Sequence, residues 1–575
     1  MTAAHYGIHW KHVMKHELEA QAQVETSQQR LWIVIIAFVC AFAVLSLRLF
    51  DISVLKDIPA NLPANYSAQP LTLDRADIVD RNGDPLASNL RTSSVFANAR
   101  LIDNPAEVAK MLHHALPDQP YNTLYEKLKS KKSFVWIKRN LTPDEEYAVN
   151  RLGIPGLTLE EGQTRVYPQG NLFSHILGYV DVDGTGIAGV EKYMDKYMKD
   201  TLNQGEQLKL SLDLRVQNIL YTILSQGVSE FKAIGANGVV MDVTNGEILG
   251  MVSLPDFDPN NVKESKDPQR FNRNTLGVYE MGSTFKTITI ANALDSGAVS
   301  LYDSYDVSQP IHYGNFTIKD FHPENGALTV PEILMHSSNV GTAKIALDVG
   351  KKRQREFINE LGLMSPLEIE LPERGNSVYP DVWADIHSMT IAFGHGMAIT
   401  PLHLVQAVSA IVNGGTFYPA TLIKGKKNTG RQVISAATSE TMRKLMRLVV
   451  TDGTGSKANI KGYLVGGKTG TAEKASHGGY NHHAMLSSFV GVYPLNKPRY
   501  LVLVMLDEPQ GNKETGGFAT GGMTAAPLVG KIIEQMSPVL SIEPVDESSK
   551  TLQKAFYVDY KRKHSEFAAN PDLAR

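Results

Sequence analysis

Cysteine is almost absent from this chain of 575 residues, which contains only Cys40. No intramolecular disulfide can form, and neither a thiolate zinc site nor an iron–sulfur cluster can be assembled. An excess of charge is also lacking, because 57 basic and 60 acidic side chains leave a formal net charge of −3. Without a basic field, the composition gives no support to nucleic-acid binding. The length predicts two or three folded units.

Charged residues are missing from one long apolar run, residues 31–47 (LWIVIIAFVCAFAVLSL), whose apolar character continues to Phe50. Because about twenty helical residues span the ~30 Å hydrocarbon core, the run predicts a transmembrane anchor over residues 31–50. Basic residues before the run predict that residues 1–30 are a cytoplasmic tail and that the remainder is periplasmic. Ala41-Phe42-Ala43 resembles a cleavage site, so a removed signal peptide is the alternative; the apolar residues beyond it favour an uncleaved anchor.

The region 51–207 has no recognisable active-site pattern and is interpreted as an accessory domain. It opens with a proline-containing stalk, residues 51–70. Asp77–Asp84 then reads as a strand that enters an Asn-Gly turn. Short strands and helices alternate from there to about residue 205.

Residues 208–540 are predicted to form one large α+β domain. A hairpin pattern at 238–252 and another at 487–506 stand near its two ends, and helical patterns lie between them at 283–296, 330–347 and 438–450. This order predicts an antiparallel sheet in which the first and last hairpins meet, flanked by helices and with a mainly helical lobe inserted. The polar residues 541–575 are predicted to be a loosely ordered tail.

Three short patterns carry the chemistry: Ser283-Thr-Phe-Lys286, Ser337-Ser-Asn339 and Lys468-Thr-Gly470. Each is weak alone, and Ser229-Glu-Phe-Lys232 is interpreted as a chance match to the first pattern on a solvated helix face. Ser283 differs because it opens an apolar helix, where free N–H groups and the helix dipole favour a developing alkoxide. Lys286 is three residues further, on the same helix face and within reach of the serine oxygen.

A buried lysine beside a second cation can lose its proton and act as the base that a serine nucleophile needs. Lys468 is the candidate for this second cation. Ser337 is expected to transfer a proton to the leaving amine, and Asn339 to hold a peptide carbonyl through its amide.

The stretch VGGKTGTA, which contains Lys468, Thr469 and Gly470, suits an exposed strand edge that can take an extended peptide as an added strand. Lys468 and Thr469 would bind the terminal carboxylate of such a peptide. The backbone N–H groups of Ser283 and Thr471 would form the oxyanion hole.

A nucleotide hydrolase is the alternative from another class, because Gly462–Thr469 also satisfies the phosphate-binding pattern G-x-x-x-x-G-K-[ST]. Leu501–Glu508 could be the strand that carries a magnesium-binding acid. However, residues 456–461 are too polar for the strand that should precede the loop, and Gly470 interrupts the helix that should follow it.

Two further features are interpreted as structural. Four histidines at helical spacing in the N-terminal tail could bind a metal, but no acid or cysteine framework accompanies them, so a polar helix face is favoured: His5, His9, His12 and His16. The glycine-rich residues 515–522 are predicted to form a loop near the site and not a phosphate cradle.

These residues resemble the class B penicillin-binding proteins, and most closely their division-septum branch, over nearly all of residues 30–535. The likeness extends beyond the three catalytic patterns to segments of the accessory domain and of the second domain: RADIVDRNG at 75–83, RVYPQG at 165–170, GIAGVE at 186–191, YEMGSTFK at 279–286, GGKTGTA at 466–472 and TAAP at 524–527. Three positions depart from the family's usual residues: Ala76, Met281 and His395. No departure removes a catalytic group.

The resemblance implies a penicillin-binding transpeptidase fold with an elongated accessory domain, and peptidoglycan D,D-transpeptidation. In that reaction Ser283 attacks the D-Ala-D-Ala carbonyl of a stem peptide, and the amine of a neighbouring strand resolves the acyl-enzyme. It also implies acylation by β-lactams and no cofactor or metal. The implied partners are peptidoglycan, a glycan polymerase and division-site membrane proteins, and the implied location is the inner membrane. An elongation-specific transpeptidase and a β-lactamase or β-lactam sensor are the alternatives within the class.

Overall fold

The computed structural model describes residues 32–47, 75–200, 206–314, 316–476 and 479–560, and the chain divides into two units, residues 1–72 and 73–575. In the first unit, residues 32–47 form a helix with exposed apolar side chains. Within the described segments, no helix is both long enough and apolar enough to cross a membrane. The predicted tail 1–30, the outer ends of the predicted anchor 31–50 and the stalk 51–70 lie outside the described residues.

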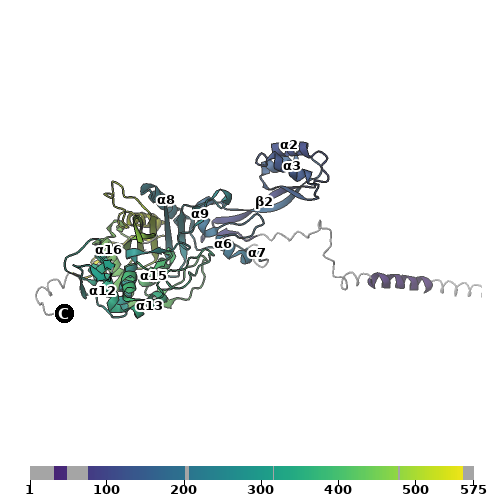
Figure 1. The fold of residues 1–575 in the computed structure, drawn as a ribbon. Helices are drawn as coiled ribbons and strands as arrows, with labels where there is room; N and C mark the ends of the chain where they lie inside the picture. Colours follow the sequence, from purple (N-terminus) through teal and green to yellow (C-terminus); the bar gives the residue numbers. More distant parts are fainter. Residues whose placement is uncertain (1–31, 48–74, 201–205, 315, 477–478, 561–575) are drawn as a thin grey trace, which may run out of the picture. The chain divides into compact units, whose positions relative to one another are not determined.

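The second unit begins with a five-stranded sheet arranged around one long strand, β2 (Pro85–Ala97). The other strands are β1 (Ile78–Val79), β3 (Val135–Leu141), β4 (Leu157–Val166) and β5 (Leu208–Lys209). β1, β3 and β4 pair with β2 in antiparallel fashion, and β5 pairs in parallel with β1. Helices α2 (Pro105–Ala115), α3 (Tyr121–Lys129) and α4 (Pro143–Asn150) pack on this sheet around a small apolar core (Figure 1).

The predicted Asn-Gly turn joins β1 to β2. The Asp80 carboxylate accepts hydrogen bonds from the backbone N–H groups of Asn82, Gly83 and Asp84 at 2.7, 2.9 and 2.9 Å. Gly83 has φ +102, a backbone conformation that residues with a Cβ rarely adopt. The local sequence therefore favours this turn, and a hydrogen bond of 3.1 Å from the Leu214 N–H to Asp80 joins it to the larger domain.

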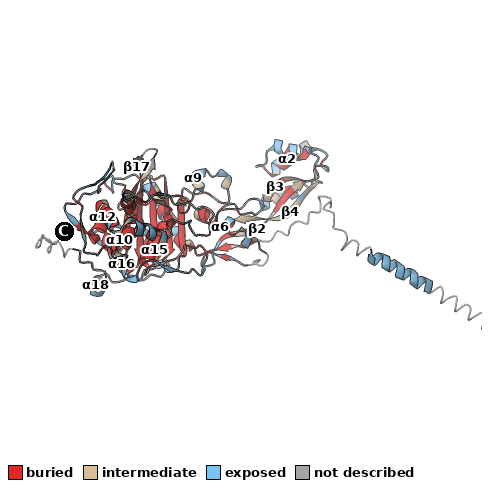
Figure 2. Cartoon of the chain, turned by 60° about the horizontal axis from the view of Figure 1, so that its bottom comes forward, coloured by how far each residue is buried: buried red, intermediate tan, exposed pale blue. Residues whose placement is uncertain are grey.

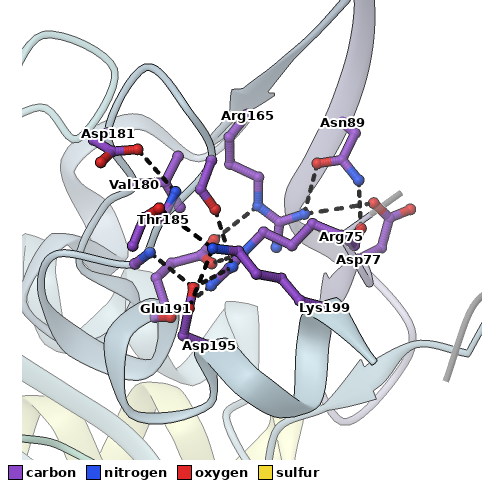
Figure 3. Close-up of polar contacts among 12 residues, drawn as sticks. Arg75, Asp77, Asn89, Arg165, Val180, Asp181, Thr185, Glu191, Asp195 and Lys199 are labelled. Carbon is purple, nitrogen blue, oxygen red and sulfur yellow. Dashed lines mark hydrogen bonds and ion pairs between the residues drawn. The ribbon is translucent and has the colours of Figure 1, made fainter. Parts of the chain in front are cut away.

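Three segments that resemble the family's accessory signatures meet in one buried ion-pair network (Figure 3). Glu191, at the start of α6 (Gly189–Tyr193), is fully buried and lies 2.6 Å from Arg75 Nε and 2.7 Å from Arg165 Nε. Arg75 also reaches Asp195, in α7 (Asp195–Lys199), at 2.6 Å. Asn89 of β2 accepts from Arg165 at 3.1 Å. One carboxylate thus connects the start of this unit, β4 and α6.

The larger domain is arranged around a second five-stranded antiparallel sheet, in the order β16-β17-β18-β6-β7. Its strands are β6 (Gly235–Asp242), β7 (Ile248–Leu254), β16 (Gly466–Ser476), β17 (Gly479–Tyr493) and β18 (Tyr500–Asp507). β6 pairs with β18, so the first and last hairpins meet as predicted. Strand β16 is at one edge of the sheet.

Side chains that alternate along β18 enter two separate cores. Leu501, Leu503 and Met505 belong to the core shared with the helical lobe, whereas the alternate residues Val502 and Val504 pack with α8 (Leu214–Glu230) and α17 (Ala525–Val539). Both faces of the sheet are therefore covered by helices, and Figure 2 shows its strands as buried.

The lobe between β7 and β16 is mainly helical, as predicted (Figure 1). Its helices are α9 (Asp267–Arg270), α10 (Lys286–Asp295), α11 (Val330–His336), α12 (Asn339–Val349), α13 (Lys351–Glu360), α14 (Asp385–Ala392), α15 (Pro401–Val412) and α16 (Ala436–Thr451). Its short strand pairs are β8 (Tyr279–Glu280) with β13 (Ala398–Ile399), β9 (Ser304–Asp306) with β12 (Ala327–Thr329), β10 (Ile311–Tyr313) with β11 (Phe316–Ile318), and β14 (Thr416–Phe417) with β15 (Arg431–Gln432).

Two expectations are wrong in detail. The helix predicted over 330–347 is divided at Ser337, which adopts φ +64 and ends α11, and Ser338 then caps α12. Residues 541–560 of the predicted loose tail pack on the domain: they include α18 (Lys550–Phe556), and Val545, Leu552 and Phe556 contact the main core. Apolar residues spaced along this polar segment, together with hydrogen bonds of Glu547 and Val545, hold it there. Residues 561–575 lie outside the described part.

We predict that Glu191→Gln destabilises the accessory region by about 3 kcal/mol or more, because it removes the carboxylate that two buried guanidinium groups share and leaves Arg75 paired with Asp195 alone. Hydrogen exchange of the full chain should become faster in peptides from residues 75–97 and stay unchanged in residues 235–254. Asp195→Asn, at the more exposed partner, is the matched control and should have a smaller effect. Equal exchange in the wild type and Glu191→Gln would contradict the prediction.

Candidate active site

Ser283 lies in a single 3-10 turn, Gly282–Phe285, that leads directly into α10. The sequence predicts it in the first turn of the helix, and the structure places it just before the first residue of α10, Lys286. Gly282 has φ +53, and a Cβ there would be 2.7 Å from the carbonyl oxygen of Thr471 in β16. The absence of a side chain at Gly282 therefore lets the turn that carries Ser283 contact the edge strand.

Lys286 is fully buried and its amine lies among oxygen atoms from two of the three patterns. Its Nζ is 3.0 Å from Ser283 Oγ, 3.1 Å from Ser337 Oγ and 2.7 Å from Asn339 Oδ1. It also donates to the carbonyl oxygen of Ser337. The amine is therefore directly next to the hydroxyl that it would deprotonate.

The second pattern stands at the break between α11 and α12. Ser337 adopts the left-handed conformation, which is uncommon for a residue with a side chain and costs about 1 kcal/mol or more. The buried Ser338 caps α12 by accepting from Gly341 N–H at 2.9 Å. The break presents Ser337 and Asn339, both half-buried, to Lys286.

Lys468 and Thr469 lie on β16 and are buried, with Lys468 fully covered. Lys468 Nζ is 3.0 Å from Ser337 Oγ and 3.2 Å from Thr469 Oγ1. Since Ser337 Oγ is 3.1 Å from Lys286 Nζ, one hydroxyl connects the two lysine amines. The expectation of an edge strand agrees with the sheet order, although the two side chains are less exposed than an open edge suggests.

Burial dominates the electrostatics of both lysines. It lowers the pKa of Lys286 well below the ordinary 10.5, and the nearby ammonium of Lys468 lowers it further, against a smaller opposing effect of Asp320. Burial alone lowers the pKa of Lys468 to about 7. Burial therefore favours the neutral form of the Lys286 amine next to Ser283.

Gly470, the last residue of the third pattern, and Thr471 after it contact the segments next to the site. A Cβ at Gly470 would be 2.3 Å from Ser488 Oγ, so only glycine fits there. Thr471 Oγ1 accepts from Gly521 N–H at 3.1 Å, which places the loop 515–522 beside β16. The oxyanion hole formed by the N–H groups of Ser283 and Thr471 stays a prediction.

Asp320 is a site residue that the sequence analysis missed. Its buried carboxylate accepts from Ser338 Oγ at 2.6 Å and from the N–H groups of Asn339 and Val340, the latter at 3.0 Å. The preceding Lys319 carbonyl accepts from Asn339 Nδ2 at 3.0 Å, which turns Asn339 Oδ1 toward Lys286. No local pattern marks Asp320, because the partners that give it this role are 18 to 20 residues further along the chain.

His395, one of the departures from the family pattern, belongs to a turn that contacts the segment directly before Ser283. Gly282 N–H donates to the carbonyl of Gly394 at 3.1 Å, and Gly396 N–H donates to Glu280 at 2.7 Å. Burial lowers the pKa of His395, and Lys286 lowers it further, against an opposing effect of Glu280. His395, where the family usually has another residue, is therefore close to the site, and the candidate catalytic groups are all still present.

The structure does not support the competing interpretations. Lys468 and Thr469 are residues of strand β16 that pair with Val490 and Phe489 of β17, whereas a phosphate-binding loop requires the start of a helix at this point. Ser229 and Lys232 are exposed at the end of α8. The histidine stripe lies outside the described residues, and within them no group of three or more metal-binding side chains occurs.

Comparison with known proteins agrees with this geometry. The family model of the penicillin-binding protein transpeptidase domain matches residues 237–534, and that of the penicillin-binding protein dimerisation domain matches residues 71–208. The chain belongs to the penicillin-binding protein transpeptidase family. The resemblance inferred from the motifs is thereby confirmed.

Named relatives cover most of this penicillin-binding protein. It is 40% identical over 489 residues to the probable peptidoglycan D,D-transpeptidase FtsI of Caulobacter vibrioides. The match covers 83% of each of the two chains. It is 30% identical to the peptidoglycan D,D-transpeptidase FtsI of Escherichia coli, over 83% of this chain and 85% of the relative. Penicillin-binding protein 3 of Mycobacterium tuberculosis, solved in complex with aztreonam, has the same fold, with a TM-score of 0.65 and 24% identity over 82% of this chain and 97% of that one.

We predict that the rate of acylation by a fluorescent penicillin depends on the protonation states of both lysines. The rate should rise as Lys286 loses its proton, at a pH well below 10.5, and fall as Lys468 loses its charge near pH 7, because a neutral amine attracts the drug's carboxylate less. In Lys468→Arg the cation stays charged, so the descending limb should disappear while the maximal rate falls. A descending limb near pH 7 that persists in Lys468→Arg would assign it to another group.

We predict that Asp320→Asn lowers the acylation rate about tenfold or more, because each hydrogen bond to a charged group contributes about 1.5–3 kcal/mol and about 1.4 kcal/mol corresponds to tenfold. The matched control is Asp306→Asn, the same chemical change at an exposed carboxylate that accepts from the nearby Ser308. Stopped-flow labelling measures both variants. Equal rates in the two would show that Asp320 does not orient the site.

Proposed function

We propose that this penicillin-binding protein is a peptidoglycan D,D-transpeptidase and that Ser283 is its nucleophile. The observation that carries the proposal is the 3.0 Å separation between Lys286 Nζ and Ser283 Oγ in a site where burial favours the neutral amine. The names of the relatives support the same reaction. Neither the site nor the proposed chemistry calls for a cofactor.

In the acylation step, neutral Lys286 takes the proton of the Ser283 hydroxyl as Oγ attacks the carbonyl of the penultimate D-alanine. The C–N bond to the terminal D-alanine then breaks. Ser337 Oγ, between the two lysine amines, gives its proton to the leaving amine and regains one from protonated Lys286. The products are an ester at Ser283, free D-alanine and neutral Lys286.

In the second step, the amine of a neighbouring stem peptide attacks the Ser283 ester. The amine loses a proton through the same hydroxyl and lysine, Ser283 regains its proton as the C–O bond breaks, and a new peptide bond joins the two strands. The half-buried setting of Ser283 beside fully buried lysines favours an amine held in place over free water.

Donor binding follows from β16. An extended stem peptide can add along the edge strand, and the cation of Lys468 with the hydroxyl of Thr469 can hold its terminal carboxylate. The Thr469 hydroxyl is fixed by Thr454 Oγ1 at 2.8 Å. The carboxylate of a β-lactam would bind the same pair.

The finer biological assignment rests on the FtsI relatives and on the apolar run at 31–50. The proposal places the enzyme at the division septum, held in the inner membrane by a single pass, with its catalytic domain in the periplasm. Its partners would be a glycan polymerase and other division-site membrane proteins. A fluorescent fusion that localises along the side wall and not at the septum would assign it to elongation instead.

We predict that Ser283→Ala abolishes covalent labelling of the full-length protein by fluorescent penicillin, whereas Ser229→Ala, in the other S-x-x-K match, labels like the wild type. Labelling that persists for many minutes in the wild type indicates a transpeptidase, whereas rapid release of hydrolysed drug indicates a β-lactamase. Retained labelling in Ser283→Ala would overturn the proposed nucleophile.

A further inference from the structure

Residues 541–560 are here named the C-terminal strap. They contact the transpeptidase domain at Gly462, in the turn just before strand β16. Glu547 of the strap accepts from the backbone N–H of Gly462 at 2.6 Å and from Arg447 Nη2 at 2.8 Å. Val545 N–H donates to the carbonyl of Gly462 at 2.8 Å. The strap is therefore bonded to the turn 459–465, which directly precedes β16.

Arg447 extends this contact to the strand itself. It projects from α16 and is buried, with 7% of its surface exposed. Its Nη1 donates to the Val465 carbonyl at 2.7 Å and to Asn459 Oδ1 at 2.9 Å. Val465 is the residue before β16, so a guanidinium paired with Glu547 fixes the point where the strand begins.

The turn 459–465 and the first residue of β16 pack closely against the strap and against α16. Gly462 has φ +92, and a Cβ there would be 2.9 Å from Pro544 Cβ of the strap. Leu464 has φ +42, which is uncommon for a residue with a side chain. At Gly466, a Cβ would be 3.1 Å from the backbone nitrogen of Arg447. Such a strained turn keeps its shape only where surrounding contacts impose it.

We propose that Glu547 is a positioning residue for the transpeptidase site, which through Arg447 and the turn 459–465 sets the position of β16 and hence of Lys468 against Ser337. The proposal rests on the proposed function, because it concerns the acylation of Ser283. Lys468 is two residues beyond Gly466, and its Nζ must stay 3.0 Å from Ser337 Oγ. A displacement of about 1 Å can cost about 100-fold in rate, so a small shift of the strand has a large kinetic effect.

The experiment compares Glu547→Gln with Glu543→Gln in the full-length protein. Glu543 is an exposed residue of the same strap, so the control makes the same chemical change away from the turn. Stopped-flow acylation by fluorescent penicillin is measured from pH 5 to pH 9 at a temperature at which circular dichroism shows both variants folded. We expect Glu547→Gln to acylate at least about tenfold more slowly, a change of about 1.4 kcal/mol in the barrier.

The pH profile separates positioning from simple loss of stability. A loosened β16 admits water to Lys468, so the descending limb near pH 7 should move to higher pH in Glu547→Gln and stay in place in Glu543→Gln. A folded Glu547→Gln with a wild-type rate and a wild-type limb overturns the proposal, even if its melting temperature is lower. A slower rate with an unmoved limb also overturns it.

If Glu547→Gln does not fold, Glu547→Asp decides. The shorter side chain keeps the charge but cannot hold both Gly462 and Arg447 at their present distances. An intermediate acylation rate with the descending limb moved to higher pH supports positioning. A wild-type pH profile overturns the proposal. The outcome is distinct from a failure of the proposed function, which would appear as absent labelling of Ser283 in the wild type.

Discussion

The active site depends on the burial of two lysine amines around one serine hydroxyl. Removing ammonium groups from water is costly, and the cost is reduced when a group gives up its proton. In the proposed mechanism Lys286, surrounded by oxygen atoms of Ser283, Ser337 and Asn339, is the base, while Lys468, whose pKa burial lowers to about 7, supplies positive charge below that pH. Desolvation of charged groups would destabilise an ordinary protein core. Here it lowers the pKa of both lysines and so favours the neutral amine that the proposed reaction needs.

Holding two such groups together requires a rigid surrounding, and the sheet provides it. Both faces of the sheet are covered by apolar cores, so β16 can carry Lys468 in a fixed register with β17. The break between α11 and α12 supplies Ser337 from the lobe, and Asp320 fixes that break through its bonds to Ser338 and Asn339. Contacts outside the reacting groups therefore determine their distances.

Local patterns predicted the features that depend on neighbours in the chain. The Asn-Gly turn at 82–83 and the hairpin of β6 and β7 follow from their turn residues and from the short apolar runs beside them. The break at Ser337 was missed because the segment 330–347 has helical spacing throughout. The packing of the strap was missed because a polar composition hides the few apolar residues and the carboxylate that attach it.

The sequence by itself determined the reaction class, since the three patterns, in their order and with their flanking segments, identify the transpeptidase family and predict a nucleophile, a base and a carboxylate-binding strand. Only the tertiary structure decided which groups touch. The ion pairs of Glu191, the hydrogen bonds of Asp320 and the contacts of Glu547 join residues that are 18 to 116 positions apart in the chain. Burial and distance, which set the pKa of each lysine, arise only when such separate segments are packed together.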